Sequence, residues 1–284
     1  MLIGIDLGNF GVNTSEGDFF YSKISEGSSF TDKNRIIYEG KELQIAEGEF
    51  STDWNKSEKE TTLPLLFSAL ARSSKENFFQ VVLGLPIQQY NANKANYKRY
   101  IEENRGKTII YKGIKREIII SDVIIAPEGA AAYYNLSEEQ KILIGNKPLI
   151  IVDIGGRTTN ICLFENGKII KVWTVPTGML NIYQDIISYI NTKYTEEFKL
   201  EDGELILKEG LFLKGKNKDV TFIKPILQRH FNSIYKDLQL NFNTSKGYVL
   251  LTGGGSITLR KAFQNRLDNL IMSNQPLTDN ATGF

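Results

Sequence analysis

Two short segments of the chain place an aspartate and glycines directly after an apolar run. The first is IGIDLGNFGVNT at residues 3–14, and the second is IVDIGGRTTNICLF at residues 151–164. Asp6 and Asp153 are each followed by one spacer residue and a glycine, and then by a second strand-like run. Glycine lets backbone N–H groups approach a phosphate closely, and hydroxyl side chains add donors. One such segment alone is more often an ordinary β-turn, but two in matched contexts favour a phosphate site.

The two aspartates lie about half the chain length apart. This separation predicts two half-domains, each with a hairpin that carries an aspartate, facing one another across a cleft. Mg²⁺ is usually held by one or two carboxylates together with phosphate oxygens and water. Asp6 and Asp153 are therefore the candidate ligands of Mg²⁺, bound through water.

A third glycine-rich segment, TGGGS at residues 252–256, lies between an apolar strand and a predicted helix. A helix that begins after such a loop offers N–H groups to an anion or a nucleotide. A tight strand-to-helix connection is an equally good interpretation of this segment alone. The sequence contains neither G-x-x-x-x-G-K-[ST] nor a strand-linked G-x-G-x-x-G, which excludes the P-loop and the dinucleotide fingerprint.

Glu128 lies in the segment APEGAAAYY, after an apolar strand and a proline. We expect a helix to begin here, and a carboxylate at a helix start interacts favourably with the helix dipole. The functional alternative is a base, or a group that orients water, directed into the cleft.

Composition narrows the classes of protein further. The 284 residues carry a net charge of +1, with 41% hydrophobic and 24% charged residues, so bulk charge does not favour nucleic acid or a membrane surface. Cys162 is the only cysteine and His230 the only histidine. This excludes an internal disulfide, a thiolate metal cluster and a histidine-rich metal site. We expect a cytoplasmic protein without a membrane span.

Strand-like and helix-like patterns alternate along the chain, which predicts an α/β protein with sheets covered on both faces. The expected helices cover residues 61–73, 93–104, 128–136, 178–194, 220–242 and 256–270, and the main expected strands cover residues 2–5, 78–86, 107–120, 122–126, 149–154 and 247–252.

The order of these segments resembles that of the actin-like ATPases. IDLGNFGVNT matches the first phosphate hairpin, APEGAAAYY the connecting helix with its carboxylate, VDIGGRTTNICLF the second phosphate hairpin, and LLTGGGS the nucleoside loop. Within this family the chain resembles the plasmid-segregation actins of the ParM (StbA) type, and the resemblance extends to DNATGF at residues 279–284.

This resemblance implies an actin-like, ribonuclease H-like fold with two domains, residues 1–147 plus 272–284 and residues 148–271, and a nucleotide cleft between them. It also implies an ATPase that uses ATP or GTP with Mg²⁺, polymerises with itself, and segregates plasmid DNA through a DNA-binding adaptor protein. In this interpretation Asp6 and Asp153 serve Mg²⁺ and Glu128 orients the attacking water. The implied nucleotide-binding residues are Gly8, Asn9, Asn13, Gly155, Gly156, Arg157, Thr158, Lys208, Glu209, Gly253, Gly254 and Gly255.

Some residues depart from the family pattern. Asn13 stands where many relatives place a lysine that contacts phosphate, and Arg157 stands where Gly or Thr is usual. Two alternatives to a filament-forming ATPase therefore remain open. One is a monomeric kinase or phosphotransferase on the same fold, and the other is a polymerising scaffold with little hydrolysis.

Overall fold

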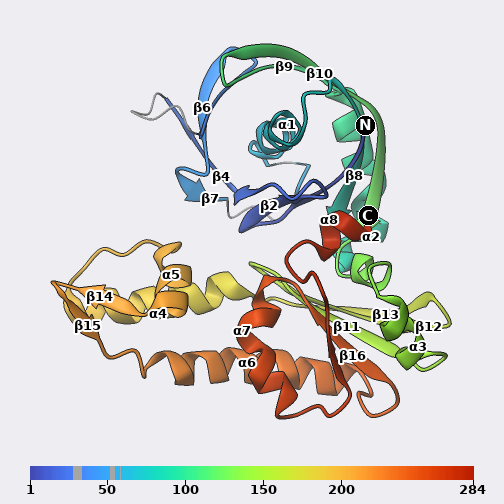
Figure 1. The fold of residues 1–284 in the computed structure, drawn as a ribbon, viewed down its shortest axis with the longest axis vertical. Helices are drawn as coiled ribbons and strands as arrows, with labels where there is room; N and C mark the ends of the chain where they lie inside the picture. The colour runs from blue at the N-terminus through green and yellow to red at the C-terminus, as the bar shows by residue number, and fades with distance from the viewer. Residues whose placement is uncertain (28–33, 52–54, 58) are drawn as a thin grey trace.

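The computed structural model describes residues 1–27, 34–51, 55–57 and 59–284. These residues form two lobes, one above the other in Figure 1. We name lobe I the part built on the ten-stranded sheet and lobe II the part built on the five-stranded sheet. Helices and strands alternate in both lobes, as the sequence predicts.

The sheet of lobe I has the strand order β3-β2-β1-β8-β10-β9-β5-β6-β4-β7 and curls around helix α1, Thr62–Ser73 (Figure 1). Because the sheet surrounds it, α1 is buried over most of its surface, with Leu66, Phe67 and Leu70 fully inside. The strands are β1 Leu2–Leu7, β2 Gly11–Thr14, β3 Phe19–Tyr21, β4 Lys23–Glu26, β5 Arg35–Tyr38, β6 Lys41–Ile45, β7 Glu49–Phe50, β8 Phe78–Leu85, β9 Gly106–Tyr111 and β10 Ile114–Pro127.

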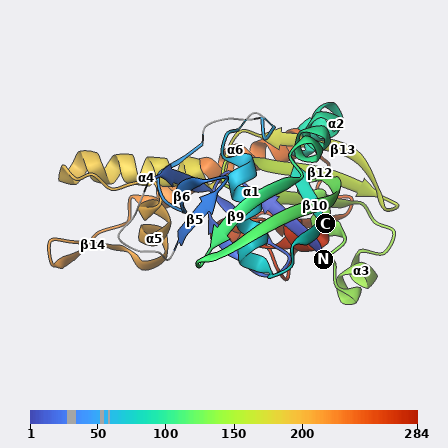
Figure 2. The same ribbon diagram turned by 90° about the horizontal axis from the view of Figure 1, so that it is seen from above.

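The sheet of lobe II has the order β13-β12-β11-β16-β17. Its central strand β11 is buried at every position and pairs in parallel with β16, which is typical of a sheet covered on both faces. The elements are β11 Leu149–Ile154, β12 Thr159–Glu165, β13 Lys168–Val175, α4 Met179–Tyr194, α5 Asp202–Glu209, β14 Leu211–Leu213, β15 Lys216–Lys218, α6 Ile223–Asn241, β16 Tyr248–Thr252, α7 Gly254–Gln264 and β17 Leu270–Met272. Seen from above in Figure 2, the β14 hairpin lies at one end of the molecule and α3, Glu138–Ile144, at the other.

The C-terminal helix α8, Asp279–Gly283, returns from lobe II to lobe I. In Figure 1 it lies at the boundary between the lobes, and it contacts β1, β8 and the 3₁₀ turn η2, Ala130–Tyr133. Gly283 approaches the Ala131 carbonyl so closely that a Cβ would lie 2.2 Å from its oxygen. The end of the chain is therefore part of the joint between the lobes.

Two expectations from the sequence were wrong in detail. The helix expected after Pro127 is only the turn η2, because Gly129 has a φ of 78° and the alanines behind it pack against α8. The polar helix expected at residues 93–104 is α2, Ile87–Glu103, which begins earlier. The reason is that the Pro86 carbonyl accepts hydrogen bonds from the first turn, while Ile87 is buried. No helix in the described part of the chain is both long and apolar enough to cross a membrane.

Candidate functional site

Asp6 and Asp153 meet at the boundary between the lobes through a single amide group. Asn280 of α8 donates from Nδ2 to Asp6 Oδ2 at 3.2 Å and to Asp153 Oδ2 at 3.1 Å. The side-chain amide oxygen Oδ1 of Asn280 accepts a hydrogen bond from the backbone N–H of Gly129 at 2.9 Å. One side chain therefore connects β1, β11 and the segment after β10.

Burial changes the protonation of both aspartates. It raises the pKa of Asp6 to about 6, and the nearby charge of Glu128 adds to this shift. Burial also raises the pKa of Asp153 to about 7, with the hydrogen bond from Asn280 acting in the opposite direction. A cation beside these carboxylates would favour their charged forms. A cation bound beside Asp6 and Asp153 would therefore oppose the increase in pKa that burial causes.

The two carboxylates fit Mg²⁺ by their chemistry. Magnesium prefers oxygen ligands, and it usually binds one or two carboxylates together with substrate phosphates and water. Asp6 Oδ1 is buried and has no hydrogen-bond partner within the described residues. No group of three or more His, Cys, Asp and Glu side chains in that part of the chain could hold a metal ion. The donor set thus suits an ion that is also held by phosphate oxygens.

Glu128 faces the same boundary and forms a buried ion pair. Its Oε1 lies 2.5 Å from Lys56 Nζ, and Lys56 also donates to the Gly84 carbonyl at 3.0 Å. The Glu128 backbone N–H donates to the Leu85 carbonyl at 2.8 Å, which fixes the main chain beside β8. The carboxylate therefore does not act as a simple helix-dipole partner, since no α-helix begins at this position.

The first hairpin joins β1 to β2 and contains Gly8 and Asn9. A Cβ on Gly8 would lie 2.8 Å from the Gly11 carbonyl oxygen, so this turn requires glycine. Asn9 Oδ1 accepts a hydrogen bond of 2.7 Å from Lys59 Nζ. Asn13 is half-buried on β2 and pairs with Asp6 across the two strands.

The second hairpin joins β11 to β12 and lies against the first. A Cβ on Gly156 would be 2.6 Å from Cβ of Phe10, so the two hairpins touch at this point. The carbonyls of Gly155 and Gly156 accept hydrogen bonds from the first turn of α4. Thr158 is buried, and Arg157 is half-buried.

The glycine-rich loop closes over Asp153 from the side of β16. A Cβ on Gly253, whose φ is 78°, would lie 2.3 Å from Asp153 Oδ1. Helix α7 begins at Gly254, inside the triple glycine, and Gly255 packs on Ile154. This loop therefore places a helix N-terminus next to the aspartate pair.

A second set of contacts joins β3 and β4 of lobe I to the start of α5 in lobe II. Lys23 Nζ bonds Glu201 Oε1 at 2.7 Å, and the Tyr21 hydroxyl donates to Glu204 Oε2 at 3.0 Å. Phe10 packs nearby, with ring centroids 5.6 Å from Tyr183 on α4 and 5.4 Å from Phe50 on β7. We call these residues the aromatic contact, which consists of Phe10, Tyr21, Lys23, Phe50, Tyr183, Glu201 and Glu204.

Comparison with known families assigns both halves of the chain. Residues 4–130 match the family model "Actin like proteins N terminal domain". Residues 151–265 match the model "Archaeal actin homologue MreB-like, C-terminal". Together these two matches cover most of the sequence. The chain belongs to the actin-like proteins.

Solved structures have the same actin-like fold. An archaeal actin homologue, Ta0583, in complex with ADP has a TM-score of 0.86 and 18% sequence identity, over 100% of this chain and 97% of that one. A 15-stranded ParM filament from Clostridium botulinum has a TM-score of 0.84 and 20% identity, over 99% of this chain and 97% of that one. The predicted two-domain actin-like architecture and the resemblance to ParM are thereby confirmed.

A curated relative matches a shorter part of the actin-like chain. It is the cell division protein FtsA of Pseudomonas aeruginosa, 34% identical over 93 residues, which are 32% of this chain and 21% of FtsA. The aligned part thus spans about a fifth of the length of that relative.

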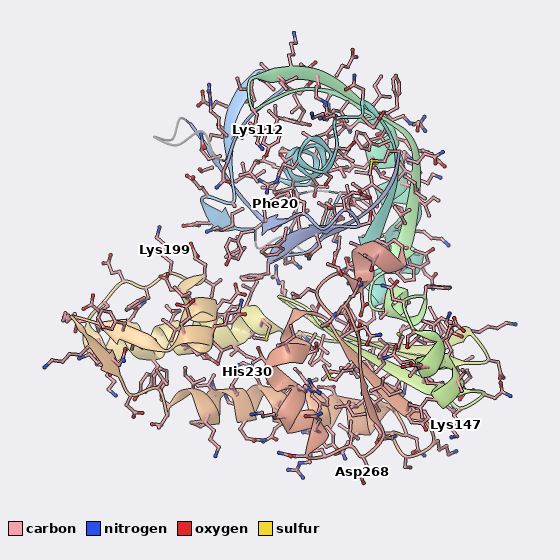
Figure 3. All side chains as sticks on the ribbon, in the orientation of Figure 1. Phe20, Lys112, Lys147, Lys199, His230 and Asp268 are labelled. Carbon is pink, nitrogen blue, oxygen red and sulfur yellow. The ribbon has the colours of Figure 1, made fainter. Side chains whose placement is uncertain are left out.

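Most of the residues predicted from the sequence surround one point in this actin-like fold. Asp6 and Asp153 share the Asn280 amide, and Gly253 lies against Asp153. Glu128 is near enough to Asp6 for its charge to add to the pKa increase that burial causes, and the two hairpins lie beside these residues. Lys208 and Glu209 are exposed at the end of α5, where Lys208 bonds Glu204 at 2.5 Å. No contact described for these two residues links them to the aspartates. His230 lies on α6 in lobe II, 2.6 Å from Asp185 (Figure 3).

Three residues at the site were not predicted from the sequence, namely Lys56, Lys59 and Asn280. The lysines lie in a polar segment that reads as an exposed loop. Asn280 belongs to DNATGF, a segment included in the family resemblance, and this resemblance was the one sequence feature that could have indicated a role for Asn280 at the site.

Proposed function

We propose that this actin-like protein binds ATP or GTP with Mg²⁺ between Asp6 and Asp153 and hydrolyses the nucleotide. The observation that supports this most strongly is the meeting of two aspartates from hairpins on opposite lobes at one amide. A structural relative described as a complex with ADP supports the nucleotide. Mg²⁺ would neutralise charge on the phosphate oxygens and on the aspartates.

The glycine-rich turns would bind the phosphates. Backbone N–H groups at Gly8, Asn9 and Gly156 are the proposed donors, since glycine permits close approach. Gly155 would line the phosphates without donating, because its N–H donates to the Thr158 carbonyl at 2.9 Å. The Thr158 hydroxyl, the Asn13 amide and the Arg157 guanidinium would add to them. Gly253, Gly254 and Gly255 would lie against the nucleoside. Lys208 and Glu209 are the weakest candidates, because they are exposed at the end of α5.

Glu128 would orient the water that attacks the γ-phosphorus. The water oxygen forms the new bond to phosphorus as the bond to the bridging oxygen breaks, and the nucleoside diphosphate leaves. Positioned acids and bases contribute about 10²–10⁴-fold to such reactions. Lys56 would fix the direction of the Glu128 carboxylate through the 2.5 Å contact.

We also propose that the protein assembles with itself into filaments. Nucleotide binding would favour one angle between the lobes, and that angle would shape the surface met by the next subunit. Head-to-tail contacts of this heterologous kind do not close, so they propagate. Hydrolysis would weaken the contact through differential affinity for the two lobe arrangements. A relative described as a ParM filament supports this proposal.

The finer biological role follows from the same resemblance. We propose a cytoplasmic protein that segregates plasmid DNA through a DNA-binding adaptor. The proposed domains are residues 1–147 plus 272–284 and residues 148–271, since α8 packs on β1 and β8 of lobe I.

Light scattering and phosphate release, measured in parallel, test the main proposal. With ATP and Mg²⁺ we expect scattering to rise above a critical protein concentration and to fall as phosphate appears. Asp153→Ala should lose Mg²⁺-dependent nucleotide binding, and Asp268→Ala, an exposed aspartate on lobe II (Figure 3), is the matched control. Phosphate release by a protein that never scatters would instead favour the monomeric enzyme.

The Lys56–Glu128 pair favours a second candidate, a filament-forming scaffold that hydrolyses very slowly. The Lys56 ammonium already contacts Glu128 Oε1, so only part of the carboxylate is available to accept a hydrogen bond from water. Glu128→Gln separates the candidates. A large fall in turnover with unchanged nucleotide affinity supports the ATPase, while an already negligible wild-type turnover supports the scaffold.

A further inference from the structure

One amide group of the C-terminal helix orients both candidate metal ligands. Asn280 Nδ2 donates to Asp6 Oδ2 at 3.2 Å and to Asp153 Oδ2 at 3.1 Å, and an amide nitrogen has two hydrogens to donate. The Asn280 Oδ1 atom accepts the backbone N–H of Gly129, which fixes the direction in which the amide faces. The two aspartates belong to different lobes, yet the same group sets their relative orientation.

The position of Asn280 is fixed by the packing of its neighbours in α8. Asp279 is 2% exposed and accepts hydrogen bonds from the Thr252 hydroxyl of β16 and from Asn135 Nδ2. Ala281 is 1% exposed, and α8 packs on β1 and β8. Because the residues on both sides of Asn280 are buried, its amide has little freedom to follow the aspartates. The amide therefore sets the positions of the two carboxylates.

The hydrogen bonds from this amide leave carboxylate oxygen available to a cation. Asn280 contacts the Oδ2 atom of each aspartate, whereas Asp6 Oδ1 is buried without a hydrogen-bond partner among the described residues. A buried oxygen without a donor lowers stability unless a ligand or a cation meets it. Two carboxylates that face one site also repel each other, and a donor shared between them reduces this repulsion before the ion binds.

We propose that Asn280 is a positioning residue for Mg²⁺ at this site. It holds Asp6 and Asp153 in one common orientation, so that the oxygen that it does not contact is available to the ion that binds with the nucleotide. The hydrogen-bond partners of metal-ligating side chains contribute about 10- to 100-fold to metal affinity. This inference rests on the proposed function, because it concerns the same site.

The test measures how much Mg²⁺ the protein needs in order to bind ATP. Calorimetry gives the ATP affinity of wild type and of Asn280→Ala at a series of Mg²⁺ concentrations, and the concentration that produces half of the full effect is compared. Adenosine is measured beside ATP, because it has no phosphate to bind the ion.

Asn135→Ala is the matched control. Asn135 Nδ2 holds the same helix through the Asp279 carbonyl at 3.1 Å and the Thr282 hydroxyl at 2.6 Å. Within the described residues it bonds neither aspartate. This variant therefore loosens α8 and leaves the hydrogen bonds of the aspartates in place.

We expect Asn280→Ala to raise the Mg²⁺ concentration at half effect by roughly 10-fold or more, with adenosine affinity unchanged. Asn280→Ser keeps one donor on a shorter side chain and should lie between Asn280→Ala and wild type. Asn135→Ala should lower the Tm of the nucleotide-free protein, as Asn280→Ala does, but its Mg²⁺ requirement should equal that of wild type.

An equal increase in the Mg²⁺ requirement of Asn280→Ala and Asn135→Ala, or a parallel loss of adenosine affinity, would make Asn280 only a structural tie of α8. An unchanged requirement in Asn280→Ala would remove it from the metal site, and a lower one would show that its amide competes with the ion. Each of these results overturns the inference and leaves the proposed function intact. A wild-type protein whose ATP affinity does not depend on Mg²⁺ would overturn both. Should Asn280→Ala not fold, Asn280→Ser carries the same comparison with Asn135→Ala.

Discussion

Replacing Asp153 by asparagine should stabilise the nucleotide-free protein at pH 8 while abolishing its response to Mg²⁺ and nucleotide. Asparagine has nearly the same shape as aspartate and can still accept the hydrogen bond from Asn280. It carries no charge that must be buried. A buried carboxylate that binds a cation is thus expected to lower the free energy of unfolding when the cation is absent.

The magnitude follows from the pKa of Asp153, which burial raises from 3.8 to about 7. Between these values the folded chain binds a proton that the unfolded chain has released, so stability falls as pH rises through this range and is constant above it. One pKa unit is about 1.4 kcal/mol, which gives an upper limit of about 4 kcal/mol at pH 8. Allowing for relaxation of the site, we expect Asp153→Asn to gain about 2–4 kcal/mol there and little at pH 4.

Thermal unfolding of both proteins between pH 4 and pH 8.5, in the presence of EDTA, measures this difference. For a chain of this size the gain corresponds to a rise in Tm of roughly 5–15 °C at pH 8. Adding ATP and Mg²⁺ should then raise the Tm of the wild type but not of the variant, because only the wild type binds.

Asp185→Asn is the control of opposite sign. Although burial alone would raise the pKa of Asp185, the hydrogen bonds from His230 and Arg229 hold it below its usual value. Its replacement should therefore destabilise the protein at pH 8. If Asp153→Asn changed the Tm equally at pH 4 and pH 8, or lowered it at pH 8, burial of an uncompensated carboxylate would be the wrong explanation.

Three further outcomes are expected. Gly253→Ala should lower the free energy of unfolding, measured by chemical denaturation, by more than about 3 kcal/mol, because the new Cβ meets Asp153 and Ile154. Gly215→Ala, with a similar φ of 76° but open space around it, should lower it by about 1 kcal/mol, and equal decreases would contradict this explanation. Lys56→Met should cost about 3–5 kcal/mol by leaving Glu128 buried without its partner, and adding Glu128→Gln should restore most of that loss. Asn280→Ala should lower the free energy of unfolding by about 1–3 kcal/mol at pH 8, and an unchanged value would show that the amide does not hold the lobes.

Local sequence was sufficient to single out the residues of the candidate site that depend on backbone conformation. Asp6 and Asp153 each end a strand next to glycines, and this pattern survives in any fold that keeps the hairpins. Gly253 was found in the same way, from a glycine run between a strand and a helix.

The remaining parts depend on contacts between distant segments. Lys56 and Lys59 look like exposed charges in the sequence, and only the packing of the segment before α1 buries them. Asn280 acts on both aspartates because α8 returns to lobe I. The helix expected after Pro127 was wrong for a related reason, since Gly129 and the packing against α8 leave only a turn.

The aromatic contact has a consequence for how fast a ligand exchanges. The lobes are already joined by the chain between β10 and β11 and by the chain between β17 and α8. The contacts from Phe10 to Tyr183 and from Lys23 to Glu201 join them again through side chains. A bound molecule that leaves when the lobes separate would be retained longer by these side-chain contacts, so weakening the Lys23 contact should shorten its residence time more than it changes the chemistry of the site.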